Sequence, residues 1–274
     1  MLINGREIAS SIEKSLIKNI ARLKSSGIVP NLAVVLIGND PGSLKYVAQK
    51  IKTGKNLEIT VSLFRFTSSA GPSEIKMLIK KLNADRNIQG IIIQRPVPVG
   101  IPDEHLSKLV SPEKDVDGFH PVSLFDPPIA LAVIAILKSI HPKFFQRWLI
   151  KKNILIIGRG VTAGKPIAKH FEKLNLNFTI AHSQTVNFGS LVTCADILIS
   201  CVGKSNIVRH QMLKKTAILI GVGLHPEDLK LKPDYNQDKI SDRVAYYTPV
   251  PGGVGPVNVA MLFKNLVRAT GHDW

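Results

Sequence analysis

A tyrosine and a lysine four residues apart, Tyr46 and Lys50, are the first side chains in this chain whose types and spacing suggest chemistry. Residues four apart on an α-helix lie on one face of the helix. An amine that is partly removed from water can move a proton, and an aromatic ring beside it can hold a flat substrate. The competing interpretation is a solvated lysine beside a tyrosine that packs on the core.

The segments around this pair predict where both side chains lie. The apolar run 32–37 predicts a strand, residues 38–42 predict a turn, and Ser43 is a candidate N-cap of the helix that carries the pair. Residues 61–66 and 90–93 predict two further strands with a helix between them. The first part of the chain is therefore predicted to be βαβαβα, and open α/β sheets bind their ligands at the carboxyl ends of the strands.

Two more polar side chains are expected at the same edge of this sheet. Gln94 follows the third predicted strand, and its amide can fix the direction of the lysine. The loop from Asp115 to Gly118 carries two acids around one valine. This pattern predicts that one carboxylate is satisfied locally while Asp117 is presented to a ligand, where it can accept two N–H bonds from an amino-substituted heterocycle.

A glycine-rich turn dominates the second part of the chain. It follows a predicted strand over residues 152–157 and precedes a predicted helix from about residue 166. Such a turn lets a phosphate approach a helix N-terminus, although an ordinary tight turn is the alternative. The candidate cofactor-binding residues in it are Gly158, Arg159, Gly160, Gly164 and Lys165. The spacing is one residue longer than that of the common dinucleotide fingerprint.

The end of the next predicted strand favours NADP over NAD. An NAD site usually offers an acid to the ribose at this point, but residues 182–185 contain none. Ser183 and the guanidinium of Arg159 instead suit a 2′-phosphate. Near the C-terminus, residues 248–256 hold three glycines and three prolines, which predicts a fixed loop whose bare backbone can approach a ligand closely. Pro251, Gly252 and Gly253 are its candidate substrate contacts.

Composition narrows the class of protein. The 274 residues are 45% hydrophobic and 20% charged, which predicts a soluble globular protein of two domains. The N-terminal residues predict no secretory signal, no apolar run is long enough to span a membrane, and Cys194 and Cys201 lack metal-ligand spacing. We therefore expect a cytoplasmic protein without a metal. The net charge of +16 attracts anions, but the scattered lysines do not indicate a nucleic-acid site.

Five motifs in a fixed order resemble those of the bifunctional methylenetetrahydrofolate dehydrogenase/methenyltetrahydrofolate cyclohydrolase family. The motifs begin at Ser43 (S-x-x-Y-V-x-x-K-x-K), Gln94 (Q-x-P-x-P), Lys114 (K-D-V-D-G-F-H-P), Gly158 (G-R-G-x-x-x-G-K-P) and Pro249 (P-V-P-G-G-V-G-P). Together they cover nearly the whole chain.

This resemblance implies a fold, a site and two reactions. It implies a folate-binding catalytic domain of residues 1–126 and 250–274, and a Rossmann-type NADP-binding domain of residues 127–249 through which a homodimer forms. The two α/β domains would flank a cleft, with the last helix returning to the first domain. It also implies that Lys50 is the acid/base of the cyclohydrolase, that Gln94 tunes it, that Tyr46 stacks on the folate and that Asp117 grips the pterin. Tetrahydrofolate derivatives would be the substrates, and no metal would be needed.

Four stretches depart from the family's pattern. Asp126-Pro127-Pro128 replaces the usual linker sequence, Gly221 replaces a carboxylate near the nicotinamide, Pro233 precedes Asp234 in place of a glycine, and Arg95 replaces an apolar residue. Three alternatives therefore stay open at this point: a cyclohydrolase with an impaired dehydrogenase, a folate- or nucleotide-binding protein without catalysis, and another two-domain NADP enzyme similar to shikimate dehydrogenase.

Overall fold

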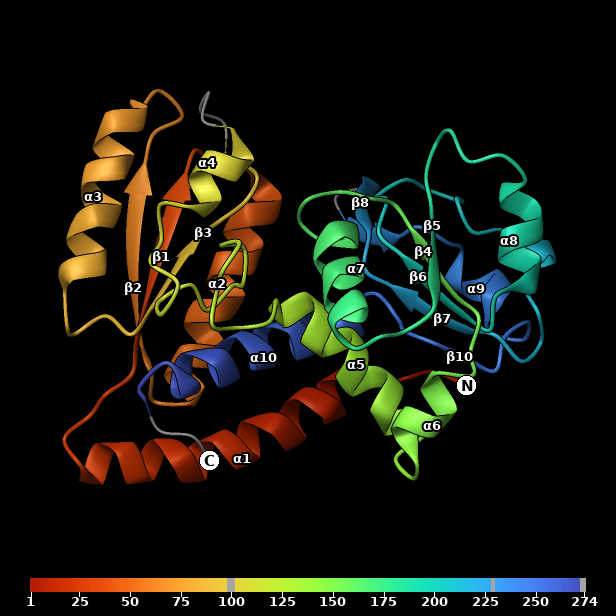
Figure 1. The fold of residues 1–274 in the computed structure, drawn as a ribbon, viewed down its shortest axis with the longest axis horizontal. Helices are drawn as coiled ribbons and strands as arrows, with labels where there is room; N and C mark the ends of the chain where they lie inside the picture. Colours follow the sequence, from red (N-terminus) through yellow and green to blue (C-terminus); the bar gives the residue numbers. More distant parts are fainter. Residues whose placement is uncertain (98–101, 228–229, 272–274) are drawn as a thin grey trace. The chain divides into compact units, whose positions relative to one another are not determined.

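The computed structural model describes residues 1–97, 102–227 and 230–271. The chain divides into two compact units. The three-stranded unit consists of Ser10–Pro128 and Val259–Trp274, and the five-stranded unit consists of Met1–Ala9 and Ile129–Asn258. Both are α/β units built on parallel sheets, so the predicted fold class is confirmed (Figure 1). Pro98, the last residue of the Q-x-P-x-P motif, lies outside the described residues.

The sheet of the three-stranded unit has the order β2-β1-β3. Its strands are β1 (Asn31–Ile37), β2 (Thr60–Phe66) and β3 (Gly90–Ile93), all parallel. Because β1 lies between the other two and is buried along nearly all of its length, its side chains feed a hydrophobic core on each face of the sheet. Val34 belongs to one core and Val35 to the other.

Helices cover both faces of this sheet. The first core is completed by α1 (Gly5–Ser25), α2 (Pro41–Asn56) and α10 (Val254–Arg268). The second is completed by α3 (Pro72–Ala84) and α4 (Asp103–Ser107). From Val259 onward α10 contributes to the first core through residues such as Phe263, so the last helix returns to this unit as predicted.

The sheet of the five-stranded unit has the order β10-β7-β6-β4-β5. The strands are β4 (Ile154–Ile157), β5 (Phe178–Ala181), β6 (Ile197–Ser200), β7 (Ile218–Gly221) and β10 (Tyr246–Tyr247). The chain moves from β4 to one side of the sheet and then returns to the other side with β6. The carboxyl ends of β4 and β6 therefore form the topological switch point, where doubly wound folds bind their ligands.

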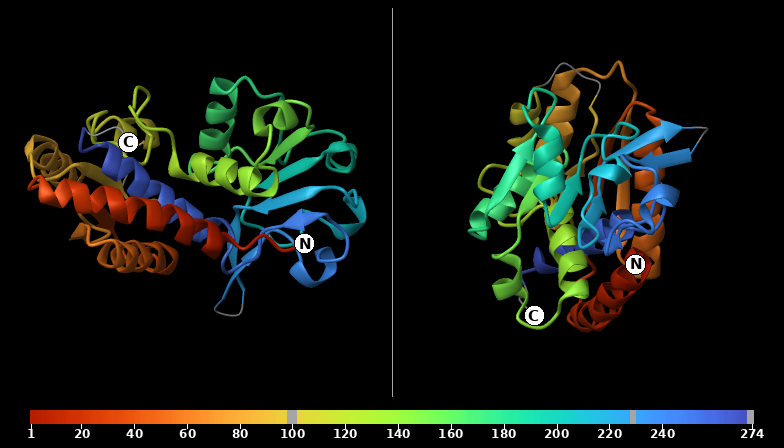
Figure 2. Two further views of the ribbon diagram at one scale, coloured as in Figure 1. Left: turned by 90° about the horizontal axis from the view of Figure 1, so that it is seen from below. Right: turned by 90° about the vertical axis from the view of Figure 1, so that its right-hand side faces the viewer.

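The remaining elements surround this second sheet. The helices are α5 (Pro128–Ile140), α6 (Phe145–Leu149), α7 (Gly164–Lys173), α8 (Phe188–Cys194), η1 (His210–Met212) and α9 (Gln237–Ile240). An antiparallel pair of strands, β8 (Leu224–Glu227) and β9 (Lys230–Pro233), follows β7. The N-terminus lies along β10, where the Ile3 N–H donates to the Tyr247 carbonyl over 2.8 Å (Figure 2).

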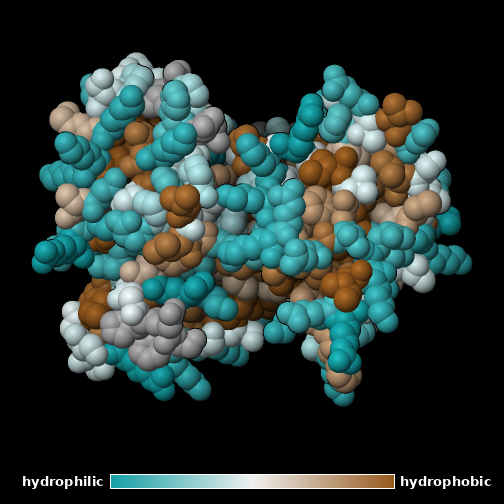
Figure 3. All heavy atoms as spheres, in the orientation of Figure 1, coloured by the Kyte–Doolittle hydropathy of each residue, from teal (hydrophilic) through white to brown (hydrophobic). Residues whose placement is uncertain are grey.

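The surface is largely polar on the face drawn in Figure 3, where hydrophobic residues gather only in small groups. None of the helices in the described part of the chain is both long enough and apolar enough to span a membrane.

Candidate functional site

Lys50 is buried at the sheet-facing side of α2. Its residue is 8% exposed, although the neighbouring positions 48, 51 and 52 of the helix are exposed. The helix is capped by Asp40, whose Oδ2 accepts from the Ser43 N–H over 2.7 Å. Ser43 is thus not the N-cap expected from the sequence. It is buried, and its hydroxyl donates to the Arg95 carbonyl over 3.3 Å, which ties the start of α2 to the loop after β3.

The partner of Lys50 is Gln94, as predicted. The Lys50 Nζ donates to the Gln94 Oε1 over 2.7 Å. Gln94 is itself fixed, because its backbone N–H donates to Val35 and its side-chain Nε2 donates to the Arg95 carbonyl, both over 2.9 Å. The amide therefore cannot rotate without losing a bond, and it presents only its oxygen to the amine.

Asp117 acts on the same lysine through its charge. Burial lowers the pKa of Lys50, and the carboxylate of Asp117 opposes that effect. Burial likewise raises the pKa of Asp117, while Lys50 and then Arg95 oppose the rise. Burial also raises the pKa of Tyr46, so its ring is held as a neutral phenol. An amine with a lowered pKa beside a carboxylate and a partly buried ring is suited to proton transfer on a flat substrate.

The two acids of the D-V-D-G stretch differ in their surroundings. Asp115 is 4% exposed and accepts from the His120 N–H over 2.7 Å, so its carboxylate is satisfied within its own loop. Burial is the main cause that raises the pKa of Asp115 to about 6. Asp117 is the one whose charge is coupled to Lys50.

The glycine-rich turn lies at the switch point of the five-stranded sheet, between β4 and α7. A Cβ at Gly164 would lie 2.0 Å from the Gly158 carbonyl oxygen, so only glycine lets the start of α7 pack against the turn. A Cβ at Gly160 would meet nothing within 4 Å, which leaves that stretch of backbone open. Arg159, Lys165 and Ser183 are all exposed. This arrangement fits the phosphates of a dinucleotide, which approach bare backbone and exposed cations.

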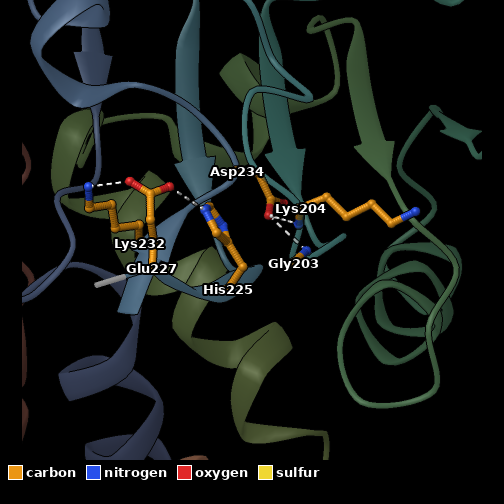
Figure 4. Close-up of polar contacts among 6 residues, drawn as sticks. All are labelled: Gly203, Lys204, His225, Glu227, Lys232 and Asp234. Carbon is orange, nitrogen blue, oxygen red and sulfur yellow. Dashed lines mark hydrogen bonds and ion pairs between the residues drawn. The ribbon is translucent and has the colours of Figure 1, made fainter. Parts of the chain in front are cut away.

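At the same switch point, Asp234 binds the loop that follows β6. From the sequence, Asp234 was recognised only as the remaining residue of a family motif. Its Oδ2 accepts from the Ser200 hydroxyl over 2.6 Å and from the Val202 N–H over 2.9 Å. Its Oδ1 accepts from the N–H groups of Gly203 and Lys204 over 2.7 and 3.0 Å. Figure 4 shows that the side chain of Lys204 points away from this carboxylate. The buried anion therefore fixes the backbone of the loop and leaves the ammonium outward.

Beside this loop, the side chains of β8 and β9 form their own polar group. His225 contacts Glu227 over 3.4 Å, and Lys232 forms an ion pair with the same carboxylate (Figure 4). The exposed Glu227 and Lys232 pair adds little stability, as is usual at a surface. It does join the two strands of the hairpin that leads the chain to Asp234.

The space next to Gly221 is filled by Tyr235. A Cβ at Gly221 would lie 2.5 Å from the Tyr235 hydroxyl oxygen. That hydroxyl donates to the Thr248 carbonyl, and the Thr248 hydroxyl accepts from the Gly221 N–H over 2.8 Å. Burial raises the pKa of Tyr235, so the group is a neutral donor. The carboxylate that is missing at position 221 thus leaves no void.

The proline- and glycine-rich loop near the C-terminus is fixed by Gln237. The Val250 N–H donates to Gln237 Oε1 over 2.7 Å, and Gln237 Nε2 donates to the Val250 carbonyl over 3.0 Å. Pro251 is exposed, and Gly252 is partly exposed. A Cβ at Gly253 would lie 2.4 Å from the Pro249 carbonyl oxygen.

The structure therefore assembles the candidate residues in two groups. Tyr46, Lys50, Gln94 and Asp117 belong to the three-stranded unit. The cofactor candidates and the loop 251–253 belong to the five-stranded unit. Among the described residues, no group of three or more His, Cys, Asp or Glu side chains is arranged to hold a metal ion.

Comparisons with known proteins match two successive parts of the chain to the two domain models of one family. Residues 3–117 match the family model described as the tetrahydrofolate dehydrogenase/cyclohydrolase catalytic domain. Residues 127–273 match the model of the tetrahydrofolate dehydrogenase/cyclohydrolase NAD(P)-binding domain. The chain is 34% identical over 271 residues to the bifunctional protein FolD of an Exiguobacterium strain, and this covers 98% of both proteins. It is 38% identical over 275 residues to bifunctional protein FolD 2 of Lactobacillus johnsonii, covering 98% of this chain and 97% of that protein.

Solved structures are similar over the same length. The bifunctional FolD methylenetetrahydrofolate dehydrogenase/cyclohydrolase from Campylobacter jejuni has a TM-score of 0.92 and 31% identity, covering 99% of this chain and 98% of that one. The Trypanosoma brucei enzyme complexed with NADP and an inhibitor has a TM-score of 0.91 and 28% identity, covering 100% and 99%. Shikimate dehydrogenase from Aquifex aeolicus, at 13% identity and a TM-score of 0.57 over 89% and 94%, is alike in fold alone.

Proposed function

This chain belongs to the tetrahydrofolate dehydrogenase/cyclohydrolase family, and from that premise we propose that it catalyses two successive steps of one-carbon metabolism. In the first, 5,10-methylenetetrahydrofolate is oxidised to 5,10-methenyltetrahydrofolate with NADP⁺. In the second, water opens the methenyl ring and gives 10-formyltetrahydrofolate. The observation that supports this function best is the buried Lys50 amine, which donates to Gln94 and is coupled to Asp117.

Lys50 moves the proton in the hydrolytic step. The methenyl carbon is electrophilic, so water that attacks it must lose a proton, and the ring nitrogen that leaves must gain one. A neutral amine can take the first proton and, once protonated, return it to the nitrogen as the carbon–nitrogen bond breaks. The second proton of the water is released to solvent as the formyl carbonyl forms. Burial lowers the pKa of Lys50 toward the range in which both forms are available. Gln94 accepts from the amine and aims it.

Tyr46 and Asp117 hold the folate for this chemistry. The Tyr46 ring stacks on the pterin, and the carboxylate of Asp117 accepts two N–H bonds from its amino-substituted edge. Both side chains belong to the same unit as Lys50. The loop Pro251-Gly252-Gly253 contributes backbone contacts to the substrate.

NADP⁺, when bound, accepts the hydride from the methylene carbon. The exposed turn with Gly158, Gly160 and Gly164 admits its phosphates, and Arg159, Lys165 and Ser183 supply charge and a hydroxyl. The net charge of +16 attracts the cofactor and the folate, both of which are anions.

We also propose the domain boundaries and the assembly that the family resemblance implies. The proposed folate-binding domain is residues 1–126 with 250–274, and the proposed NADP-binding domain is residues 127–249. These functional boundaries differ from those of the compact units, because residues 1–9 and 250–258 belong to the five-stranded unit and residues 127–128 to the three-stranded unit. The enzyme is a cytoplasmic homodimer formed through the NADP-binding domain. Support for this interface comes from β5, which ends its sheet and carries the exposed Ile180.

The proposal is tested with purified protein, methylenetetrahydrofolate and either NADP⁺ or NAD⁺. We expect reduced cofactor to form without accumulation of the methenyl compound. An Arg159→Gln variant should lose at least tenfold in kcat/KM with NADP⁺ and little with NAD⁺, whereas Arg147→Gln should behave as wild type. Hydrolysis of added methenyl substrate without NADPH formation would leave only the cyclohydrolase. The absence of both reactions would overturn the proposal.

A further inference from the structure

Arg95 directly follows Gln94 in the Q-x-P-x-P motif, at the position where the sequence comparison with the family's pattern led us to expect an apolar residue. The structure gives it a defined position. Its guanidinium carbon lies 3.8 Å from the centroid of the Phe119 ring, and its Nη2 donates to the Ser107 hydroxyl over 3.1 Å. A guanidinium that stacks on one side chain and donates to another is held in a single orientation.

This guanidinium belongs to the same cavity as the two acids of the D-V-D-G stretch. Arg95, Ser107, Asp115, Asp117 and Phe119 all line it, and the strand β3 closes its back. The positive charge of Arg95 lowers the pKa of both carboxyls, which opposes the effect of burial on each. Arg95 is therefore a partly buried cation that shares a cavity with the buried Asp115 and the partly buried Asp117.

A buried acid pair is unstable as two carboxylates unless cations compensate it. Among the residues that the structure describes, the charged groups that act on Asp117 come from three elements: Lys50 from α2, Arg95 from the end of β3, and Asp115 from the same loop. With Arg95 in place, two cations, Lys50 and Arg95, act on the Asp117 carboxyl. Without Arg95, Lys50 would be left to oppose the effect of burial, and Asp117 would retain its proton to a higher pH.

A protonated Asp117 would be a poor ligand for a pterin. Only the carboxylate offers two acceptor oxygens to two N–H groups, because the acid form turns one oxygen into a donor. A neutral acid would also cease to support the charge of Lys50.

We propose that Arg95 is a positioning residue, held by Phe119 and Ser107, that keeps the Asp117 side chain as a carboxylate acceptor for the pterin ring. This inference rests on the proposed function for the identity of the ligand, and it concerns a residue that acts through Asp117.

The test measures binding as well as turnover. The dissociation constant of tetrahydrofolate is determined by calorimetry at pH 6 and pH 8 for wild type, Arg95→Leu and Arg95→Gln. The glutamine variant keeps a donor for Ser107 but lacks the charge, so it separates the charge from the hydrogen bond. Arg86→Leu is the matched control, because Arg86 is an exposed arginine of the same unit and lies on a turn. Circular dichroism confirms that each variant is folded.

We expect the ratio of the pH 6 to the pH 8 dissociation constants to be at least fivefold larger in both Arg95 variants than in wild type. The KM for the methenyl substrate should follow the same pattern, with a smaller change in kcat. A ratio equal to that of wild type, or a loss of affinity that is the same at both pH values, would overturn the inference. If the wild type binds tetrahydrofolate but turns nothing over, the proposed function fails while the binding result still decides the role of Arg95. If tetrahydrofolate does not bind to the wild type, both fail.

Discussion

The Nζ of Lys50 and the Oε1 of Gln94 lie 2.7 Å apart, and this hydrogen bond joins the buried face of α2 to the residue that follows β3. It is the geometric core of the proposed hydrolytic site. Burial favours the neutral amine, whereas the amide oxygen and Asp117 favour the protonated amine. A lysine balanced in this way can act in both directions of a proton transfer.

Removal of the acceptor should therefore slow the hydrolysis and shift its pH dependence. A Gln94→Leu variant leaves the ammonium of Lys50 without this hydrogen bond, which is worth about 1.5–3 kcal/mol for a charged donor. We expect kcat for methenyl hydrolysis to fall roughly 10–100-fold. Because the protonated form loses a partner, the limb of the pH profile that reports Lys50 should move to lower pH. A profile that falls in height without moving would contradict this role, and Gln89→Leu is the control for loss of a side-chain amide in the same unit.

Asp115 should make the three-stranded unit less stable as the pH rises. Its pKa is about 6 in the folded chain, well above that of an unfolded aspartate, so the folded state binds the proton more tightly. Stability from this group is greatest at low pH and decreases as the pH rises from about 4 to about 6, by about 3 kcal/mol in total. Asp115→Asn should therefore gain stability relative to wild type at pH 7.5 but not at pH 4.5, measured by urea unfolding. An equal difference between the two proteins at both pH values would be inconsistent with the raised pKa.

Gly221 should not tolerate even a methyl group. An alanine Cβ there would collide with the Tyr235 hydroxyl, and forced overpacking costs about 1–3 kcal/mol. We expect Gly221→Ala to lower the melting temperature by several degrees. Gly71→Ala should lower it much less, because nothing lies within 4 Å of its Cβ position. The double variant Gly221→Ala/Tyr235→Val should be more stable than the sum of the two single changes predicts, and simple additivity would refute the assigned contact.

Asp234 should support cofactor binding through the loop after β6. An Asp234→Asn change replaces one acceptor oxygen with an NH₂ group that opposes the backbone N–H donors of this loop. We predict a rise of at least tenfold in the KM for NADP⁺ in steady-state kinetics, with hydrolysis of added methenyl substrate within threefold of wild type. Asp238→Asn, an exposed acid on α9, is the control. Equal losses in both reactions would point to general unfolding instead.

Local rules were enough to predict from the sequence that the side chains of the proposed hydrolytic site lie together. The spacing of Tyr46 and Lys50 follows from helical periodicity, and the position of Gln94 follows from the parallel order of β1 and β3. The contrast between Asp115 and Asp117 followed from the loop pattern, and the His120 N–H that satisfies Asp115 is only five residues away. These features depend on short stretches of chain, in which a pattern of residue types determines the geometry.

Contacts between distant residues were not predictable in the same way. Tyr235 fills the space at Gly221, and Asp234 binds a loop some 30 residues earlier in the chain, so neither partner is indicated by its neighbours. The hairpin of β8 and β9 was also missed, because its strands carry two prolines and no regular alternation. Arg95 was recognised as a departure from the family, but its stacking on Phe119 depends on how two loops meet.

The most direct test of the central claim follows NADPH and the methenyl compound together, in wild type and in a Lys50→Met variant supplied with methylenetetrahydrofolate and NADP⁺. Lys55→Met, an exposed lysine in the last turn of the same helix, is the control. The account predicts that the variant still forms NADPH but accumulates the methenyl compound, with hydrolysis reduced at least about 100-fold. Wild type and Lys55→Met should accumulate none. Hydrolysis by the Lys50→Met variant at a rate close to wild type would contradict the claim that this buried amine moves the proton.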